Sequence, residues 1–127
     1  MPNPEPNQWT AYIDSVIEAT RLGKIVWRKA NPTTFVWVPP TNAAQLTLQR
    51  IDGPRQTIRS GVVQVETSPQ YILQAYQIPP TPNTPPRVTI NSDDGLVPSE
   101  KLAALFNAAR EVELKGSLDF LRSLIPP

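Results

Sequence analysis

The chain contains neither cysteine nor histidine. These two absences exclude disulfides, thiolate nucleophiles, zinc sites built from Cys and His, and imidazole acid–base catalysis. A serine or threonine nucleophile would then need a lysine as its base, and none of the lysines stands in an S-x-x-K motif. The nucleophile elbow, the P-loop and the dinucleotide-binding G-x-G-x-x-G are also missing. We therefore predict a protein that is not an enzyme and has no cofactor.

Acidic residues in close spacing are few. Asp93 and Asp94 are adjacent, and Glu111 and Glu113 lie two apart on an expected helix. Neither spacing matches a general acid–base pair, and the D-x-D-x-D-G pattern of a calcium loop is absent. Because Asp-Asp-Gly is typical turn chemistry, we interpret Asn91 to Gly95 as a turn and predict no metal site.

No block of like charge occurs along the chain. The 12 basic and 11 acidic residues leave a net charge of +1, without the basic stripe of nucleic-acid or membrane-surface binders. No apolar run approaches the roughly 18 residues of a membrane span, and the N-terminus lacks the pattern of a signal peptide. We expect a cytoplasmic protein with no membrane partner, and nucleic acid is a disfavoured partner.

Proline is abundant instead, with 16 residues that must occupy loops, ends and edges. Its clusters predict a flexible leader over 1–7, a single domain over 8–125 and an exposed proline-rich loop over 79–86. That loop is either a plain connection or an extended docking segment for an aromatic groove on a partner. Pro79 and Pro82 form a minimal P-x-x-P there, followed by Pro85.

Apolar residues from Trp9 to Ile17 recur with the period of one helix face, which predicts a helix over 8–22. Asn7 is the expected N-cap, and Gly23 is the expected residue of positive φ at the C-terminus. A second helical pattern begins after Pro98, with Ser99 as its expected N-cap. Gly116 either ends this helix or lies inside one kinked helix that Pro126 stops.

Between the helical patterns, the chain is typical of short strands separated by turns. We expect strands over 24–30, 34–38, 45–51, 61–66, 71–78 and 87–90, whereas 57–60 is either strand or loop. The fold class is α+β: an N-terminal helix, an antiparallel β-meander of about four to six strands, and one or two C-terminal helices packed on one sheet face.

Aromatic and basic residues interleave on the first expected hairpin, where Trp27 and Trp37 flank Arg28. A stacking platform for single-stranded nucleic acid has this composition. The helices also need a large apolar sheet face to pack on, and the tryptophans are the obvious candidates for it. A third interpretation is a small-molecule pocket between sheet and helices, lined by Trp27, Trp37, Tyr71 and Phe106.

Two motifs carry a resemblance that covers most of the chain. Thr20 to Trp27 reads T-R-L-G-K-I-V-W, and Leu105 to Arg110 reads L-F-N-A-A-R. With the strand-like Leu46-Thr47-Leu48 between them, the chain resembles a loose set of small, uncharacterised bacterial α+β proteins. They share a T-x-x-G-K-I-x-W entry to the sheet and an L-F-x-x-A-R closing helix. The resemblance implies a fold and a bacterial context but no activity, and the proline-rich loop departs from it.

The function that these observations favour is a small protein–protein interaction module, such as an accessory or immunity-type protein that neutralises a partner. A sheet edge or the proline-rich loop would make the contact. Homodimerisation through a sheet edge or the closing helix is a further expectation, and the alternatives are the nucleic-acid and small-molecule binders above. The candidate partner-binding residues are Trp27, Arg28, Trp37, Arg50, Pro79, Pro82 and Pro85.

Overall fold

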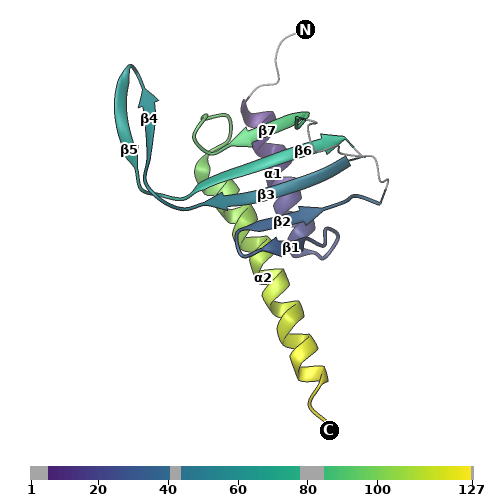
Figure 1. Cartoon of the computed structure of the whole chain (residues 1–127). Coiled ribbons are helices and arrows are strands. Elements are labelled where there is room, and N and C mark those ends of the chain that lie inside the picture. The colour runs from purple at the N-terminus through teal and green to yellow at the C-terminus, as the bar shows by residue number, and fades with distance from the viewer. Residues whose placement is uncertain (1–5, 41–43, 78–84, 127) are drawn as a thin grey trace.

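The computed structural model describes residues 6–40, 44–77 and 85–126, except the side chains of Pro6, Asn7 and Arg59. An N-terminal helix leads into seven short strands, and a long C-terminal helix closes the chain (Figure 1). The elements are α1 (Pro6–Arg21), β1 (Arg28–Asn31), β2 (Thr34–Trp37), β3 (Ala44–Ile51), β4 (Arg55–Arg59), β5 (Val62–Glu66), β6 (Gln70–Gln77), β7 (Val88–Asn91) and α2 (Ser99–Ser123). The predicted α+β class is confirmed.

Helix α1 forms as its apolar periodicity predicts, and Ile13, Val16 and Ile17 are buried. In the described residues α1 starts at Pro6, which suits the first turn of a helix, so Asn7 lies inside the helix and its prediction as N-cap is wrong. At the other end Gly23 has a φ of 77°, as expected. The Gly23 and Lys24 amides donate to the carbonyls of Thr20 and Ala19, at 3.1 and 2.9 Å. This pair of bonds is a Schellman motif, which turns the chain sharply toward the sheet.

Five strands form one antiparallel sheet in the order β1-β2-β3-β6-β7, so the main sheet falls within the expected range. The other two strands, β4 and β5, pair only with each other and form a separate hairpin. This hairpin projects from the end of the sheet where β3 leaves and β6 returns (Figure 1). We call residues 55–66 the arm.

The first hairpin, β1–β2, forms as expected, but its first strand starts at Arg28 rather than Lys24. Ile25 and Trp27 are nevertheless buried while Val26 is exposed, so the alternation predicted for a strand persists in the extended lead-in. The turn is fixed by Asn31, whose side-chain oxygen accepts hydrogen bonds from the amide and hydroxyl of Thr33.

Helix α2 runs without interruption from Ser99 to Ser123, so Gly116 neither ends nor divides it. Ser99 is its first residue and not its cap, which is Pro98 and gives no side-chain hydrogen bond. The prediction of Ser99 as N-cap is therefore wrong. A proline before the first turn already fixes φ near the helical value, so the helix can start there.

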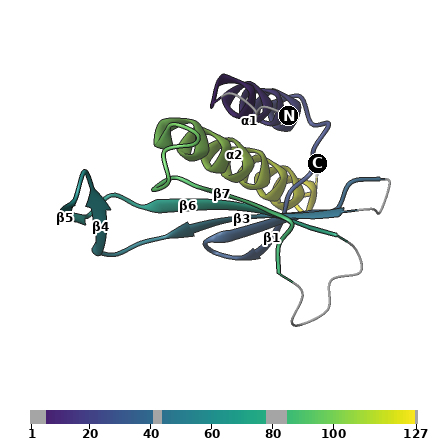
Figure 2. The ribbon, with the colours of Figure 1, turned by 90° about the horizontal axis from the view of Figure 1, so that it is seen from above.

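Both helices cover the same face of the sheet, with α2 next to the sheet and α1 beyond it (Figure 2). The core lies between these layers. Its largest fully buried side chains, at 1% exposure or less, are Phe35, Phe106, Ile13, Leu48, Leu102, Leu105, Val97 and Thr20. Only the first half of α2 joins this core, and its second half extends past the sheet (Figure 1).

Candidate functional site

The tryptophans of the first hairpin belong to the core. Trp27 is 5% exposed and donates its indole N–H to the buried Thr20 hydroxyl at 3.0 Å. Trp37 is half-buried, and its ring centroid lies 6.2 Å from that of Trp27. The interpretation of Trp27 as core is confirmed, whereas Trp37 only packs against the core. The buried Trp27 ring offers a partner or a stacking base little surface, and Trp37 as a partner-binding residue stays a prediction.

The two candidate arginines are separated by the sheet. Arg28 pairs with Val36 in register, so it projects from the face opposite to Phe35 and Trp37. Arg50 lies on the helix side, where its guanidinium carbon sits 5.3 Å from the Phe106 ring centroid. The structure therefore does not bring Arg28, Arg50 and the tryptophans together into one site.

The proline-rich candidates are described only in part. Pro79 and Pro82 lie outside the described residues, and so does most of the expected loop. Pro85 is exposed just before β7. In the leader predicted over 1–7, residues 1–5 lie outside the described part, whereas Pro6 and Asn7 open α1.

Large apolar side chains are exposed mainly on two projections of the structure, the arm and the second half of α2. On the arm, Ile58, Val63 and Val65 are 74%, 59% and 64% exposed. Ile58 pairs directly with Val63, so both side chains lie on one face of the hairpin, and Val65 shares it. The arm therefore presents a largely apolar face to solvent, on which Gln56, paired with Val65, is the polar residue.

A two-residue turn makes the arm tight. Ser60 and Gly61 connect the paired residues Arg59 and Val62, with φ values of 54° and 77°. Two successive residues of positive φ define a type I′ turn, whose twist matches that of the flanking strands. β-Branched residues on both strands favour the extended backbone. An isolated two-stranded hairpin is still only marginally stable in water, so the arm depends on its base.

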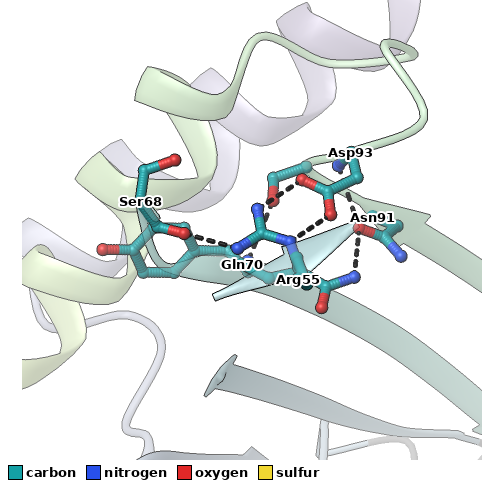
Figure 3. A network of polar contacts seen from close by, with 7 residues as sticks. Arg55, Ser68, Gln70, Asn91 and Asp93 are labelled. Atoms are coloured by element: carbon teal, nitrogen blue, oxygen red, sulfur yellow. Dashed lines mark hydrogen bonds and ion pairs between the residues drawn. The ribbon is translucent and has the colours of Figure 1, made fainter. Parts of the chain in front are cut away.

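An arginine fastens the base of the arm to the loop between β7 and α2 (Figure 3). Arg55, the first residue of β4, holds both carboxylate oxygens of Asp93, with Nη2 donating to Oδ1 at 2.6 Å and Nε donating to Oδ2. Its remaining nitrogen, Nη1, donates to the Ser68 carbonyl at the other end of the arm. One guanidinium thus joins three segments, and we call Arg55, Ser68 and Asp93 the clamp.

Further hydrogen bonds hold the loop that carries Asp93, the acidic residue of the clamp. Asn91 Oδ1 accepts a hydrogen bond from the Asp93 amide at 2.9 Å and another from the Gln70 side chain at 2.9 Å (Figure 3). Asp94 Oδ1 accepts from the Leu96 amide two residues on. The turn predicted over Asn91 to Gly95 is therefore confirmed, and its order explains how Asp93 is oriented toward the arm.

The electrostatic environment of Arg55 agrees with a close ion pair between Arg55 and Asp93. The hydrogen bond to Asp93 is the largest cause that raises the pKa of Arg55 above its usual value. Both side chains are mostly screened from solvent, at 18% exposure for Arg55 and 17% for Asp93. Because a bidentate pair has a defined geometry, the clamp fixes the direction of the arm as well as its attachment.

A separate apolar pocket of about 320 Å³ lies between the start of α1 and the sheet. It is lined by Gln8, Trp9, Tyr12, Leu46, Leu73, Ala75, Val88 and Ile90. The predicted lining of Trp27, Trp37, Tyr71 and Phe106 is wrong, because none of these residues lines this pocket. Their rings pack in two groups instead, Trp27 on Trp37, and Phe106 on Phe35 and Tyr71. Burial at the pocket edge raises the pKa of the Tyr12 hydroxyl.

Within residues 6–40, 44–77 and 85–126, no group of three or more acidic residues is placed to hold a metal ion. Over the same part of the chain, no helix combines the length and apolar character needed to cross a bilayer.

Sequence reasoning missed both exposed apolar projections. For the arm, one signal was available: Ser60-Gly61 between two β-branched segments is a two-residue hairpin sequence. The partner of Arg55 had no such signal, because Asp93 lies 38 residues away and meets it only through the fold.

Comparison of the chain with protein-family models, curated proteins and solved structures found no match. The resemblance to small bacterial α+β proteins therefore stays a prediction.

Proposed function

We propose that this chain is a non-catalytic protein–protein interaction module that binds its partner through the apolar face of the arm. The observation that carries the proposal is a marginal hairpin that keeps Ile58, Val63 and Val65 exposed while a clamp holds it in place. Exposed apolar patches of this kind typically mark interaction sites in soluble proteins. The partner is another protein, and the setting that we propose is the cytoplasm of a bacterium.

Two properties of the arm suit a protein partner. Within the described part of the chain its outer edges pair with no other strand, so a partner strand can extend the hairpin by backbone hydrogen bonds. The alternate side chains Val63 and Val65 then supply specificity from one face. A prearranged arm also loses little conformational freedom on binding, which favours affinity. An immunity-type or accessory protein would act in this way by covering a surface of its partner.

The experiment is an affinity capture from native lysate, with and without nuclease, read by mass spectrometry. The test variant replaces Val63 and Val65 with threonine, which keeps side-chain shape and β-propensity while making the face polar. The control is Gln64→Thr, on the other face of the same strand. We expect the wild type and the control to retain a stoichiometric protein that the double variant loses.

Two results would contradict the proposal: capture of no protein by the wild type, or equal capture by the double variant. Recovery that disappears with nuclease would point to nucleic acid instead. Such a result would favour single-stranded nucleic-acid binding, a function that the burial of Trp27 argues against.

The pocket under α1 favours a second candidate function, the binding of a small apolar molecule. Its volume of about 320 Å³ lies at the lower end of the range for ligand sites, and its lining is almost entirely apolar. Gln8 and the Tyr12 hydroxyl are the polar groups that could orient a ligand. This candidate requires no catalytic residue.

A thermal-shift screen with small apolar metabolites tests this second function, because a ligand that binds only the folded state raises its stability. Ala75→Trp should block the pocket from the sheet side and abolish any shift. Gln64→Thr, far from the pocket on the arm, is the matched control. A shift that survives Ala75→Trp would place the ligand elsewhere.

A further inference from the structure

The second half of α2 carries apolar side chains that no described part of the chain covers. Beyond the core residues, which end at Ala109, the helix continues for about four turns past the sheet (Figure 1). In and just after this half, six large apolar residues are about half to two-thirds exposed: Leu114, Leu118, Phe120, Leu121, Leu124 and Ile125. Helices of this length gain most of their stability from packing, so a free apolar end is costly.

Four of these residues do not simply extend the core-facing side of the helix, whereas Phe120 lies on the same side as the buried Leu102. At about 100° per residue, Leu114 lies roughly 180° around the axis from the buried Leu105. Leu118, Leu121 and Ile125 continue the line of Leu114 at spacings of four, three and four. This is the a/d spacing of a coiled-coil seam, and we call these four residues the distal stripe. The stripe begins at the edge of the domain, where Leu114 lines a hollow with Phe35 and Pro32, and its other residues continue along the projecting part of the helix.

The charges of the same helix half indicate what kind of surface fits the distal stripe. Glu111, Lys115, Asp119 and Arg122 lie along one side at spacings of four, four and three, with alternating sign. Opposite charges at these spacings are close enough to pair within their own helix, and the two acidic and two basic residues leave no basic excess. Anionic lipid surfaces and nucleic acids require such an excess. A neutral protein surface, such as another amphipathic helix, is the occupant that the charges favour.

The exposed apolar area of the distal stripe suits a weak dimer. Its four side chains are 46–71% exposed and expose on the order of 400 Å² in one chain, the size of a patch that often marks an interaction site. Two copies that cover each other would bury about 800 Å² of apolar side chain, the size of a weak, concentration-dependent interface. Phe120 and Leu124 lie on other sides of the helix, outside this contact.

We infer that two copies of this chain pair through the distal stripe as antiparallel helices. A two-fold axis between Asp119 and Phe120 places Leu118 opposite Leu121 of the second copy. The same axis places Leu114 opposite Ile125. All four stripe residues are thereby matched, as an isologous interface requires. The overlap of helix runs from Leu114 to the last helical residue, Ser123, about 14 Å, and Ile125 follows just past the helix end, so each domain lies beyond the end of its partner's helix.

The test measures the mass of the full chain in solution by sedimentation equilibrium over a wide concentration range. We expect twice the 14.1 kDa chain mass, falling to one chain mass on dilution. Leu118→Asp should raise the dimer dissociation constant at least about 100-fold, because symmetry buries two unpaired carboxylates. Leu121→Gln, which introduces no charge, should weaken the dimer in the same direction.

The matched control is Gly116→Asp, which adds the same charge to the same helix about 160° away from Leu118. A Cβ at Gly116 would meet no atom within 4 Å, so the domain should fold normally. The control should keep the wild-type dissociation constant. Equal weakening by Leu118→Asp and Gly116→Asp would overturn the assignment of the stripe.

Helix direction is tested with single cysteines, which the natural chain lacks. An equal mixture of Leu114→Cys and Ile125→Cys chains is oxidised and the disulfides are identified by mass spectrometry. An antiparallel pair gives mainly the mixed 114–125 disulfide, whereas a parallel pair gives 114–114 and 125–125 and overturns the arrangement. A chain that stays monomeric at all concentrations overturns the inference entirely. Capture of a partner through the arm would be unaffected by that result.

Discussion

At the scale of the residue, one buried hydroxyl connects α1 to the entry of the sheet. Thr20 accepts the indole N–H of Trp27 at 3.0 Å and donates to the Val16 carbonyl at 2.8 Å. Thr20→Val keeps the shape but leaves the indole N–H without an acceptor. We expect a loss of about 1–3 kcal/mol in the free energy of unfolding, measured by urea denaturation.

A suitable comparison is Ser15→Ala, which removes an exposed hydroxyl bonded to the Ala11 carbonyl. This change should leave stability within about 0.5 kcal/mol of wild type, as exposed substitutions usually do. Losses of equal size in Thr20→Val and Ser15→Ala would mean that the buried hydrogen bond contributes no more to the free energy of unfolding than the exposed one.

The clamp is the second residue-scale feature with a measurable consequence. Arg55→Lys keeps the positive charge but cannot hold both oxygens of Asp93 and the Ser68 carbonyl in one plane. We expect a loss of about 1.5–3 kcal/mol in stability and faster amide hydrogen exchange in the arm. Arg87→Lys, at an exposed and longer contact to Gln77, serves as control. Unchanged exchange in the arm would mean that the clamp does not hold it.

Tyr12 gives the molecule an alkaline pH dependence. Burial raises the pKa of its hydroxyl above the ordinary value of 10.0. The folded state therefore retains this proton more tightly than the unfolded state, and stability falls as the pH rises above about 10. Tyr12→Phe removes this contribution, so the variant should lose less stability than wild type between neutral pH and pH 11. Parallel curves of unfolding free energy against pH would contradict the assignment.

At the scale of the element, two glycines in helical surroundings should respond to alanine with opposite signs. Gly23 ends α1 with a φ of 77°, a conformation that costs other residues about 1–2 kcal/mol, so Gly23→Ala should destabilise the fold. Gly116 lies inside α2 with open space around it, so Gly116→Ala should stabilise it by about 0.5–1 kcal/mol. Urea denaturation of both variants measures the two signs, and a stabilising Gly23→Ala would contradict the Schellman assignment.

The helices and central strands were predictable because their side chains alternate with a clear period. β3 is an example: Leu46 and Leu48 are buried on one face, as the alternation predicts. The ends were less predictable. Pro6 lies in the first turn of α1, and Pro98 occupies the cap position before α2, where polar caps were expected; proline suits the start of a helix without any side-chain bond. Of the two alternatives for Gly116, the one in which it ends the helix was wrong, because a single glycine costs a long helix only about 1 kcal/mol.

The candidate site was less accessible to sequence reasoning than the fold. Composition correctly favoured Trp27 as core, since large apolar groups supply most burial energy. The same reasoning cannot identify apolar residues that remain outside. Val63 and Leu118 are patterned like core residues of a strand and a helix. Only the three-dimensional arrangement shows that the elements that carry them extend past everything that could cover them.

At the scale of the whole molecule, α2 should divide into two dynamic regions. Leu102, Leu105 and Phe106 are fully buried, whereas Leu118 and Leu121 are exposed. In a dilute monomer, amides of the first half should exchange slowly and those of the second half rapidly, because exposed helix ends open locally. Raising the concentration should slow exchange from about Leu114 onward if the copies pair. Hydrogen-exchange mass spectrometry measures both, and uniform slow exchange in the dilute monomer would contradict this division.

The course of the chain through the sheet gives the arm one more property. β3 and β6 are antiparallel neighbours along their whole lengths, from Ala44 opposite Gln77 to Ile51 opposite Gln70. Residues 52–69 therefore leave the sheet and return to it at a single point, so another segment could replace them without changing the strand pairing. Doubling the length of such an excursion costs only about 0.6 kcal/mol in closure entropy. Binding specificity could thus diversify by replacing this one excursion, while the helices and the five-stranded sheet stay as they are.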